Sequence, residues 1–216
     1  MIIDPVATAG LVAREVRTGS RDGVPTKIAV ATRTYPTDQA DLWDAVTNPD
    51  RIPRWFLPVS GELVEGGRYQ LEGNAGGVVE RCDEPSSFAV TWEMGPMVSW
   101  LTIGLSAADG GTRLELVHES PVDPEFAAMY GPGAVGVGWD LALMGLGLHL
   151  EDSTPVDPAE FETFTFSPEG IALVEHSATG WAEAAIADGD EPGPAREAAA
   201  RTVTFYTVMP EEDPSA

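Results

Sequence analysis

The sequence predicts an α+β fold in which an antiparallel sheet is covered by one long apolar helix. Turn signals recur between residues 59 and 119 at the spacing of an antiparallel meander. Segments between these turns alternate apolar and polar side chains, which leaves one face of the sheet to be covered. Residues 133–150 are almost free of charge and apolar all round, as expected of a helix buried inside a domain.

The first strand is expected at residues 26–35, TKIAVATRTY, which alternate and are rich in β-branched residue types. Residues 1–25 carry a weaker pattern, with a turn expected over residues 19–23, GSRDG. We therefore treat residues 1–25 as an N-terminal extension of the domain.

Two helices are expected after this strand. Thr37 or Asp38 can cap the first, because a short side-chain oxygen accepts hydrogen bonds from the unpaired backbone N–H groups at a helix start. Leu42 belongs to its apolar stripe. A second, short helix begins around Pro49, where the missing N–H of proline costs nothing, and stops at Pro58.

Five or six strands are expected between residues 59 and 119, separated by clusters of Gly, Pro, Asn, Asp and Ser. Alternation in two of these strands gathers apolar and aromatic side chains on one face: Phe88, Val90, Trp92 and Met94 in the first, and Leu114, Leu116 and His118 in the second.

The covering helix, residues 133–150, is long and apolar enough to approach the signature of a membrane span. Asp140 near its middle opposes insertion by about 2.5–3.5 kcal/mol, and the sequence shows no second span, so a soluble core helix is expected. Glycines inside a helix cost roughly 1 kcal/mol each relative to alanine. Those of this segment therefore indicate close approach to the sheet or room for a ligand.

The chain continues after the covering helix. Ser167 is a good start for a helix that runs to Gly189, and residues 191–194, EPGP, are expected to break the chain before a last helix at about 195–208. Both helices carry apolar stripes, so we expect them to pack as a hairpin on the domain. Residues 151–216 are thus expected to form an acidic helical extension.

The stretch from Tyr35 to Tyr69 reads YPTDQADLWDAVTNPDRIPRWFLPVSGELVEGGRY. Its W-D-A, T-x-P, R-W-F and G-G-R-Y pieces follow an order that resembles the SRPBCC (START / Bet v-like) superfamily, and within it the subfamily similar to the activator of the heat-shock-protein-90 ATPase. The resemblance covers residues 26–150. It implies a helix-grip fold, a curved antiparallel β-sheet wrapped around a long C-terminal α-helix, often with an apolar cavity between them; the two C-terminal helices are extra to that fold.

Composition limits the partners and cofactors. The formal net charge of −23 at pH 7 makes nucleic acid and anionic membrane surfaces poor partners, because a polyanion repels phosphate. Cys82 is the only cysteine, which excludes an intramolecular disulfide and a thiolate metal cluster. The three histidines are too far apart in sequence for a local metal site, so no metal and no other cofactor is expected. The first residues lack a secretion signal, so we expect a cytoplasmic protein.

Aromatic side chains give the strongest indication of a binding site. They fall in segments that the helix-grip fold brings to its core or mouth, where they either line a cavity for a flat or acyl ligand or simply fill the space. Histidines on the sheet face and on the covering helix either anchor such a ligand or complete the core. The expected ligand-binding residues are Trp55, Phe56, Tyr69, Trp92, Trp100, His118, Trp139, Leu143, Leu146 and His149, and no catalytic residue is assigned.

Three functions are compatible with these features. The favoured one is binding of a small hydrophobic molecule, lipid-like or aromatic and polyketide-like, between sheet and helix. The second is a cyclase, dehydratase or hydrolase-like enzyme whose polar groups would come from His118, His149, Glu80 or Asp140. The third is a co-chaperone that activates the heat-shock-protein-90 ATPase, which the resemblance alone suggests. Association into a homodimer stays open.

Overall fold

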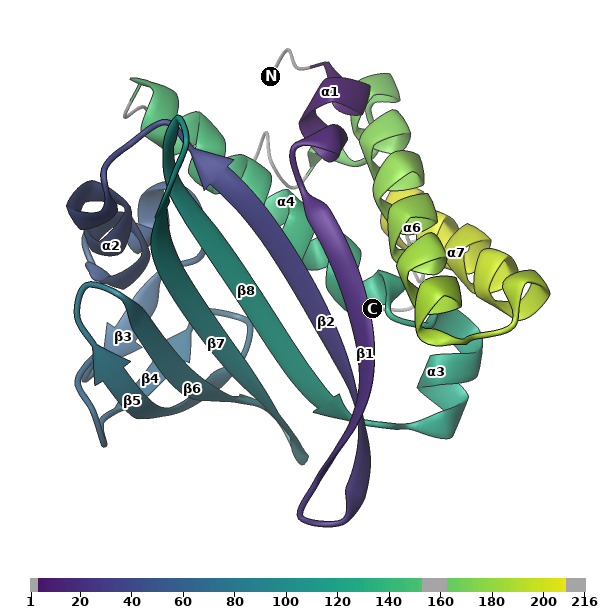
Figure 1. Cartoon of the computed structure of the whole chain (residues 1–216), viewed down its shortest axis with the longest axis horizontal. Coiled ribbons are helices and arrows are strands. Elements are labelled where there is room, and N and C mark those ends of the chain that lie inside the picture. The colour runs from purple at the N-terminus through teal and green to yellow at the C-terminus, as the bar shows by residue number, and fades with distance from the viewer. Residues whose placement is uncertain (1–3, 153–162, 209–216) are drawn as a thin grey trace, which may run out of the picture.

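The computed structural model describes residues 4–152 and 163–208 (Figure 1). Its strands are β1 (Ala13–Arg21), β2 (Val24–Tyr35), β3 (Val59–Gly61), β4 (Arg68–Leu71), β5 (Gly76–Asp83), β6 (Ser87–Met94), β7 (Met97–Ala108) and β8 (Gly111–Pro121). Its helices are α1 (Pro5–Gly10), α2 (Gln39–Thr47), the 3-10 helix η1 (Ile52–Arg54), α3 (Pro124–Tyr130), α4 (Gly133–Asp152), α6 (Pro168–Asp188) and α7 (Pro192–Thr207).

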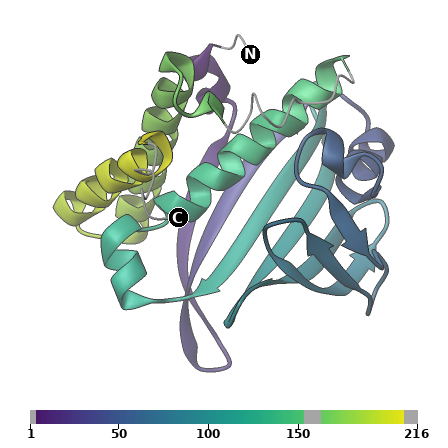
Figure 2. The same ribbon diagram turned by 180° about the vertical axis from the view of Figure 1, so that it is seen from behind.

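All eight strands form one antiparallel sheet in the order β1-β2-β8-β7-β6-β5-β4-β3. Only the step from β2 to β8 joins strands that are distant in sequence, so most of the sheet is the predicted meander. The sheet curves around α4, which crosses its concave face (Figure 2). The predicted α+β class and helix-grip architecture are confirmed.

The N-terminal residues add an edge strand to this sheet. β1 pairs with β2 along its whole length. The turn predicted over residues 19–23 occupies only Asp22 and Gly23, whose φ angles are 52° and 81°. An Asp-Gly pair tolerates positive φ and makes a preferred two-residue hairpin turn, so β1 can continue through Arg21.

α2 begins where the sequence predicts. The Asp38 side chain accepts a hydrogen bond from the backbone N–H of Asp41 at 2.9 Å and so caps the helix. The helix buries Leu42 and Trp43 against the sheet, and η1 follows it with only three residues. We call residues 39–57 the cap segment, because they cover one end of the concave face.

α4 is the core helix of the domain. It is the one helix in the described residues that is long and apolar enough to span a membrane, over Gly133–Glu151, and 78% of its most apolar window is buried inside the fold. The surface that a bilayer would have to cover is therefore already covered by protein. This agrees with the soluble core helix predicted from its composition.

Two glycines of α4 make room for side chains of neighbouring elements. A Cβ atom on Gly136 would overlap the ring of Trp181 in α6, and one on Gly147 would overlap the guanidinium of Arg33 in β2. Close approach therefore explains both glycines. At Gly147 the approach is that of the sheet, as predicted, whereas at Gly136 it is that of a C-terminal helix.

The predicted C-terminal hairpin is present, and its first helix, α6, packs on β1, α1 and α4 (Figure 1). The hydroxyl of Ser167 caps α6 by accepting from the backbone N–H of Gly170 at 3.0 Å. α7 begins at Pro192, inside the stretch predicted to break the chain. Proline is tolerated there because the first N–H groups of a helix have no partner within the helix.

The outer edge of β1 is hydrogen-bonded to the end of α6. The backbone N–H of Thr18 donates to Asp188 Oδ1 at 3.2 Å, and its hydroxyl donates to Oδ2 at 2.6 Å. The ammonium of Lys27 bridges Asp188 and Asp190 at 2.8 and 2.9 Å. The hydrogen bond from Lys27 lowers the pKa of Asp188.

One buried carboxylate joins α4 to both β1 and α6. Asp140 Oδ2 accepts from Arg14 Nε at 2.8 Å, from Trp181 Nε1 at 3.1 Å and from the hydroxyl of Ser177. The side chains of Arg14 and Asp140 are only 10% and 4% exposed. Burial raises the pKa of Asp140, while Arg14, Ser177 and Trp181 act in the opposite direction.

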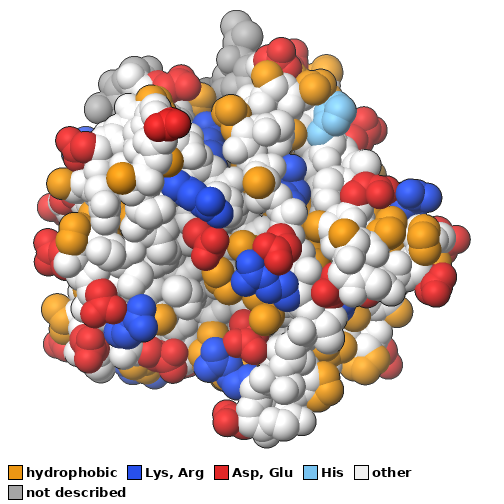
Figure 3. All heavy atoms as spheres, in the orientation of Figure 1, with side chains coloured by type: hydrophobic (Ala, Val, Ile, Leu, Met, Phe, Trp, Pro, Cys, Tyr) orange, Lys and Arg blue, Asp and Glu red, His pale blue; other side chains and the backbone are white. Residues whose placement is uncertain are grey.

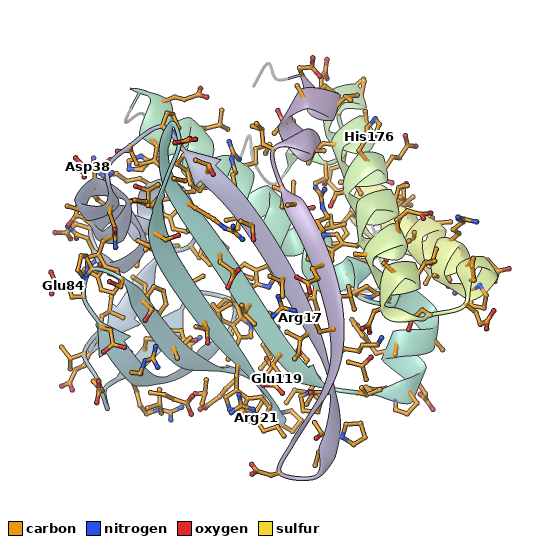
Figure 4. The ribbon with its side chains drawn as sticks, viewed as in Figure 1. Arg17, Arg21, Asp38, Glu84, Glu119 and His176 are labelled. Carbon is orange, nitrogen blue, oxygen red and sulfur yellow. The ribbon has the colours of Figure 1, made fainter. Side chains whose placement is uncertain are left out.

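The face of the sheet that α4 leaves uncovered carries charged side chains of both signs (Figure 3). Arg17 pairs with Glu15 at 2.7 Å, and Arg21 pairs with Glu119 at 2.7 Å; Figure 4 labels Arg17, Arg21 and Glu119 on this face. The Arg17–Glu15 pair is exposed and contributes little to stability, whereas the Arg21–Glu119 pair is partly buried. The pattern is that of a solvated surface.

Candidate functional site

A cavity of about 490 Å³ lies between the concave face of the sheet, α4 and the cap segment. This is within the size range of pockets that hold drug-sized ligands, roughly 300–1,000 Å³. The apolar and aromatic lining comes from three sources: Trp43, Val46, Ile52, Trp55 and Phe56 in the cap segment; Val59, Leu63, Tyr69, Leu71, Val79, Phe88, Val90, Trp92, Leu101, Ile103, Leu114 and Leu116 in the sheet and its β3–β4 loop; and Trp139, Ala142, Leu143 and Leu146 in α4.

Seven of the ten ligand-binding candidates named from the sequence lie in this lining: Trp55, Phe56, Tyr69, Trp92, Trp139, Leu143 and Leu146. They come from the cap segment, β4, β6 and α4, so the fold gathers four separate parts of the chain at one place. Trp100, His118 and His149 lie outside the lining.

Trp100 is on the opposite face of the sheet. In β7, Leu101 and Ile103 point into the cavity, so the strand's alternation directs Trp100 outward. There the guanidinium of Arg21 lies over its ring, 4.1 Å from the ring centroid. Trp100 is therefore not placed to contact a ligand in the cavity, contrary to the sequence-based expectation.

His118 lies outside the cavity lining and binds Trp139, one of the aromatic residues of that lining. The indole N–H of Trp139 donates to His118 Nδ1 at 2.8 Å, which makes Nε2 the protonated nitrogen and the donor to Ser99 Oγ, also at 2.8 Å. The Ser99 hydroxyl donates onward to the backbone carbonyl of Trp92 at 3.2 Å. Burial lowers the pKa of His118 to about 4, so the ring is neutral at pH 7. One ring nitrogen therefore binds Trp139 and the other binds Ser99, so both are occupied within the fold.

Replacing His118 with leucine should cost about 1–3 kcal/mol of the free energy of unfolding at pH 7, because the buried N–H of Trp139 loses its acceptor. The cost should shrink as the pH falls from 6.5 to about 4. The pKa of His118 in the folded state, about 4, lies below the ordinary value of 6.5, so between these pH values the folded wild-type protein binds fewer protons than the unfolded one. The wild-type protein therefore loses stability as the pH falls through this window, whereas the variant, which has no histidine here, does not. Urea unfolding of both proteins at several pH values measures this.

The control is His176→Leu, which removes an exposed histidine of α6 (Figure 4). Its effect on the free energy of unfolding should be small at every pH in this range. A cost of His118→Leu that stayed constant between pH 6.5 and 4 would contradict a buried, neutral histidine.

His149 is buried near the end of α4, outside the cavity lining. Arg51 of the cap segment reaches it, with Nε 3.4 Å from His149 Nε2. The same guanidinium binds Asp41 at 2.7 Å and Asp44 at 2.9 Å. Hydrogen bonds from Arg51 and Asn48 lower the pKa of Asp44. His149 thus belongs to the contact that holds the cap segment against α4.

The wall of the cavity is built from aromatic rings in mutual contact. The rings of Trp92 and Trp139 meet edge to face with centroids 5.0 Å apart, and Phe56 stacks on Trp139 at 6.3 Å and on Trp55 at 5.5 Å. Such pairs stabilise one another beyond the area they bury. The rings therefore form a continuous surface against which a flat molecule can lie.

The polar ends of three lining rings are bound to the protein itself. Trp55 Nε1 donates to the backbone carbonyl of Ala45 at 2.9 Å, and the hydroxyl of Tyr69 donates to that of Thr91 at 2.8 Å. Trp139 Nε1 donates to His118, as described above. These three polar groups need no hydrogen bond from a ligand, so the three rings present hydrocarbon surface to the cavity.

The candidates named for an enzyme do not meet in the cavity. Asp140 binds Arg14 on the far side of α4, and Glu80 is an exposed residue of β5. His118 and His149 are placed as described, so none of the four lines the cavity. Within the described residues, no group of three or more His, Cys, Asp and Glu side chains is arranged to hold a metal ion.

Several lining residues were not among the sequence-based candidates. Trp43, Val46 and Thr47 lie on one face of α2, at the spacing that places side chains above one another on a helix, and all three line the cavity. That spacing was readable in the sequence. Glu84 and the exposed residue Cys82 also belong to the lining. The sequence did not indicate that they line the cavity, because they lie at the end of β5, where the alternation of side chains along the strand stops.

Comparison with known proteins agrees with this architecture. The family described as "Activator of Hsp90 ATPase homolog 1-like protein" matches residues 36–151. The chain is similar to CalU16 from Micromonospora echinospora, whose solution structure is 28% identical with a TM-score of 0.68 over 82% of this chain and 97% of that one. Protein MLL2253 from Mesorhizobium loti, 22% identical with a TM-score of 0.51 over 60% of this chain and 99% of that one, shares the fold. No curated protein matches the chain.

Proposed function

This chain belongs to the activator of Hsp90 ATPase homolog 1-like family of the SRPBCC superfamily, and we propose that it binds a small hydrophobic molecule, lipid-like or aromatic, in the cavity between sheet, α4 and cap segment. The ligand would lie with its apolar body against Trp92, Trp139 and Phe56. Binding requires no covalent chemistry from the lining.

The observation that carries this proposal is a large cavity with an aromatic lining, in which the polar groups of three rings are bound to the protein itself. A cavity of about 490 Å³ is far larger than a packing defect. Because Trp55, Tyr69 and Trp139 have their hydrogen bonds satisfied by the protein, these rings offer no polar partner to water and favour contact with an apolar molecule. Burying such a molecule gains about 25 cal/mol for each Å² of apolar surface removed from water.

Tryptophan fluorescence offers a direct test, because four tryptophans line the cavity: Trp43, Trp55, Trp92 and Trp139. Anthracenylmethanol is a suitable probe, since it is flat, neutral and apolar and its anthracene absorbs the light that tryptophan emits. We expect saturable quenching of tryptophan emission with matching anthracene emission, at one probe per chain, and a rise in the thermal unfolding temperature.

Two outcomes bear on the proposal. Saturable energy transfer with thermal stabilisation supports it. If neither anthracenylmethanol nor any member of a set of neutral lipids and aromatic compounds gave saturable quenching or raised the unfolding temperature, the cavity would not be a binding site. Native mass spectrometry of the purified protein adds an independent measurement, because a retained ligand would appear as added mass.

A further inference from the structure

Acidic side chains are the only charged groups in the cavity lining within the described part of the chain. They are Asp44 in the cap segment and Glu84, which follows β5. The carboxylate of Asp44 is already bound by Arg51 at 2.9 Å and by Asn48 at 3.0 Å. Glu84 is exposed and has no ion-pair partner among the described residues, so it is the lining residue whose charge is uncompensated.

A second carboxylate, that of Glu65, lies beside the same part of the lining. Glu65 Oε2 accepts from the backbone N–H of Cys82 at 3.2 Å, and Cys82 is itself an exposed lining residue. Burial, followed by the charges of Glu84, Asp83 and Glu65, raises the pKa of the Cys82 thiol. Asp83 is paired with Arg81 at 2.9 Å. The uncompensated carboxylates are therefore Glu65 and Glu84, which we call the acidic rim; Figure 4 labels Glu84 near α2.

We propose that the ligand of this cavity carries a cationic group, such as a protonated amine, which lies at the acidic rim while an apolar or aromatic body fills the cavity. This inference rests on the proposed function, because it takes the cavity as the binding site. The cavity provides the affinity for the apolar body, and the rim selects the sign of the charge.

The wider charge distribution favours the same class of ligand. A net charge of −23 attracts cations and repels anions at long range. The guanidinium of Arg51, which contacts the lining residue Asp44, is engaged with Asp41 and Asp44 at 2.7 and 2.9 Å. An anionic amphiphile such as a fatty acid would therefore hold its carboxylate near Glu65 and Glu84 with no lining base to compensate it. Neutral and cationic ligands meet no such cost.

Three probes with one apolar body and different charges test this selection. Anthracenylmethylamine is cationic, anthracenylmethanol is neutral and anthracene carboxylate is anionic at pH 7. Titrations at low salt, followed by energy transfer from tryptophan, should give the order amine, alcohol, carboxylate from tightest to weakest. Because exposed ion pairs are weak, we expect steps of about fivefold in the dissociation constant, and these steps should shrink as salt is added.

Variants of the rim locate the effect. Glu84→Gln and Glu65→Gln should each weaken binding of the amine by about threefold and leave binding of the alcohol unchanged. Glu84→Lys should reverse the order of the amine and the carboxylate. The matched control is Glu125→Gln, which removes the same charge from α3, outside the cavity lining, and should leave the order of the three probes unchanged.

The outcomes separate this inference from the proposed function. If none of the three probes and no member of the set of neutral lipids and aromatic compounds binds, both fail. If the alcohol binds but the amine binds no more tightly than the carboxylate, the cavity is a binding site and the selection for cations is wrong. The same holds if Glu84→Lys binds the three probes in the wild-type order. Amine selectivity that Glu84→Gln reduces and Glu125→Gln does not would support the inference.

Discussion

Replacing Arg14 with methionine is expected to lower the free energy of unfolding by about 3–5 kcal/mol, because it leaves a buried carboxylate without its cation. Asp140 is 4% exposed and accepts from Arg14 Nε at 2.8 Å. Methionine keeps an apolar chain in place of the arginine stem but supplies no charge and no donor. Only Ser177 and Trp181 would remain as donors to Asp140 Oδ2 in the described structure. Urea unfolding at pH 7 measures the loss.

The loss should become smaller at acid pH. Burial already raises the pKa of Asp140 in the wild-type protein, against the opposing effect of Arg14, and removing Arg14 raises it further. A raised folded pKa means that the folded state binds more protons than the unfolded state, so the contribution of Asp140 to stability falls as the pH rises through this range. Protonation at low pH removes the uncompensated charge and restores part of the stability.

Two further variants make this prediction specific. Arg14→Met combined with Asp140→Leu should recover part of the lost stability, because it removes the uncompensated charge. Recovery should be incomplete, since the buried Trp181 N–H and Ser177 hydroxyl lose their acceptor. Arg196→Met breaks a pair with Glu183 whose side chains are 63% and 52% exposed, and should cost at most about 1 kcal/mol. Equal losses in Arg14→Met and Arg196→Met would show that burial does not set the value of the Arg14 contact.

Replacing Ala142 with phenylalanine should weaken the binding of anthracenylmethanol by about tenfold to a hundredfold. Ala142 is buried in α4 and lines the cavity one helical turn from Trp139 and Leu146. A benzyl group there would occupy space that the ligand needs, and overpacking of this kind costs about 1–3 kcal/mol, where 1.4 kcal/mol is a factor of ten in the dissociation constant. The free protein should keep its stability, because the new ring enters empty space.

The matched control is Ala187→Phe, which adds the same group to an exposed position of α6. It should bind anthracenylmethanol as the wild-type protein does. Energy-transfer titrations and thermal unfolding are measured for both variants. Unchanged affinity in a fully folded Ala142→Phe protein would mean that the probe binds elsewhere.

Much of the fold was predictable because single-sequence patterns reflect local burial. The strand faces that hold Phe88 and Leu114 alternate with period two, and both residues line the cavity. Trp139, Leu143 and Leu146 recur at helical spacing and share the cavity face of α4. In each case the pattern that forms the element also fixes which side chains it buries.

Other features depend on contacts that no local pattern encodes. Trp100 was a candidate from its residue type, but its direction depends on the register of β7, in which Leu101 takes the inward position. The short helices α1 and α3 were not predicted; helices of this length gain their stability from tertiary packing rather than from propensity. The role of His118 required the position of Trp139, which is distant in sequence.

The contact between β1 and α6 also bears on how the protein behaves at high concentration. A nine-residue edge strand offers a row of backbone groups to which another chain can add, which is a common route to aggregation. Here Asp188 takes the N–H of Thr18, and α6 packs against the strand. The opposite edge, β3, has only three residues. By lying against this strand, α6 therefore hinders another chain from pairing with its edge.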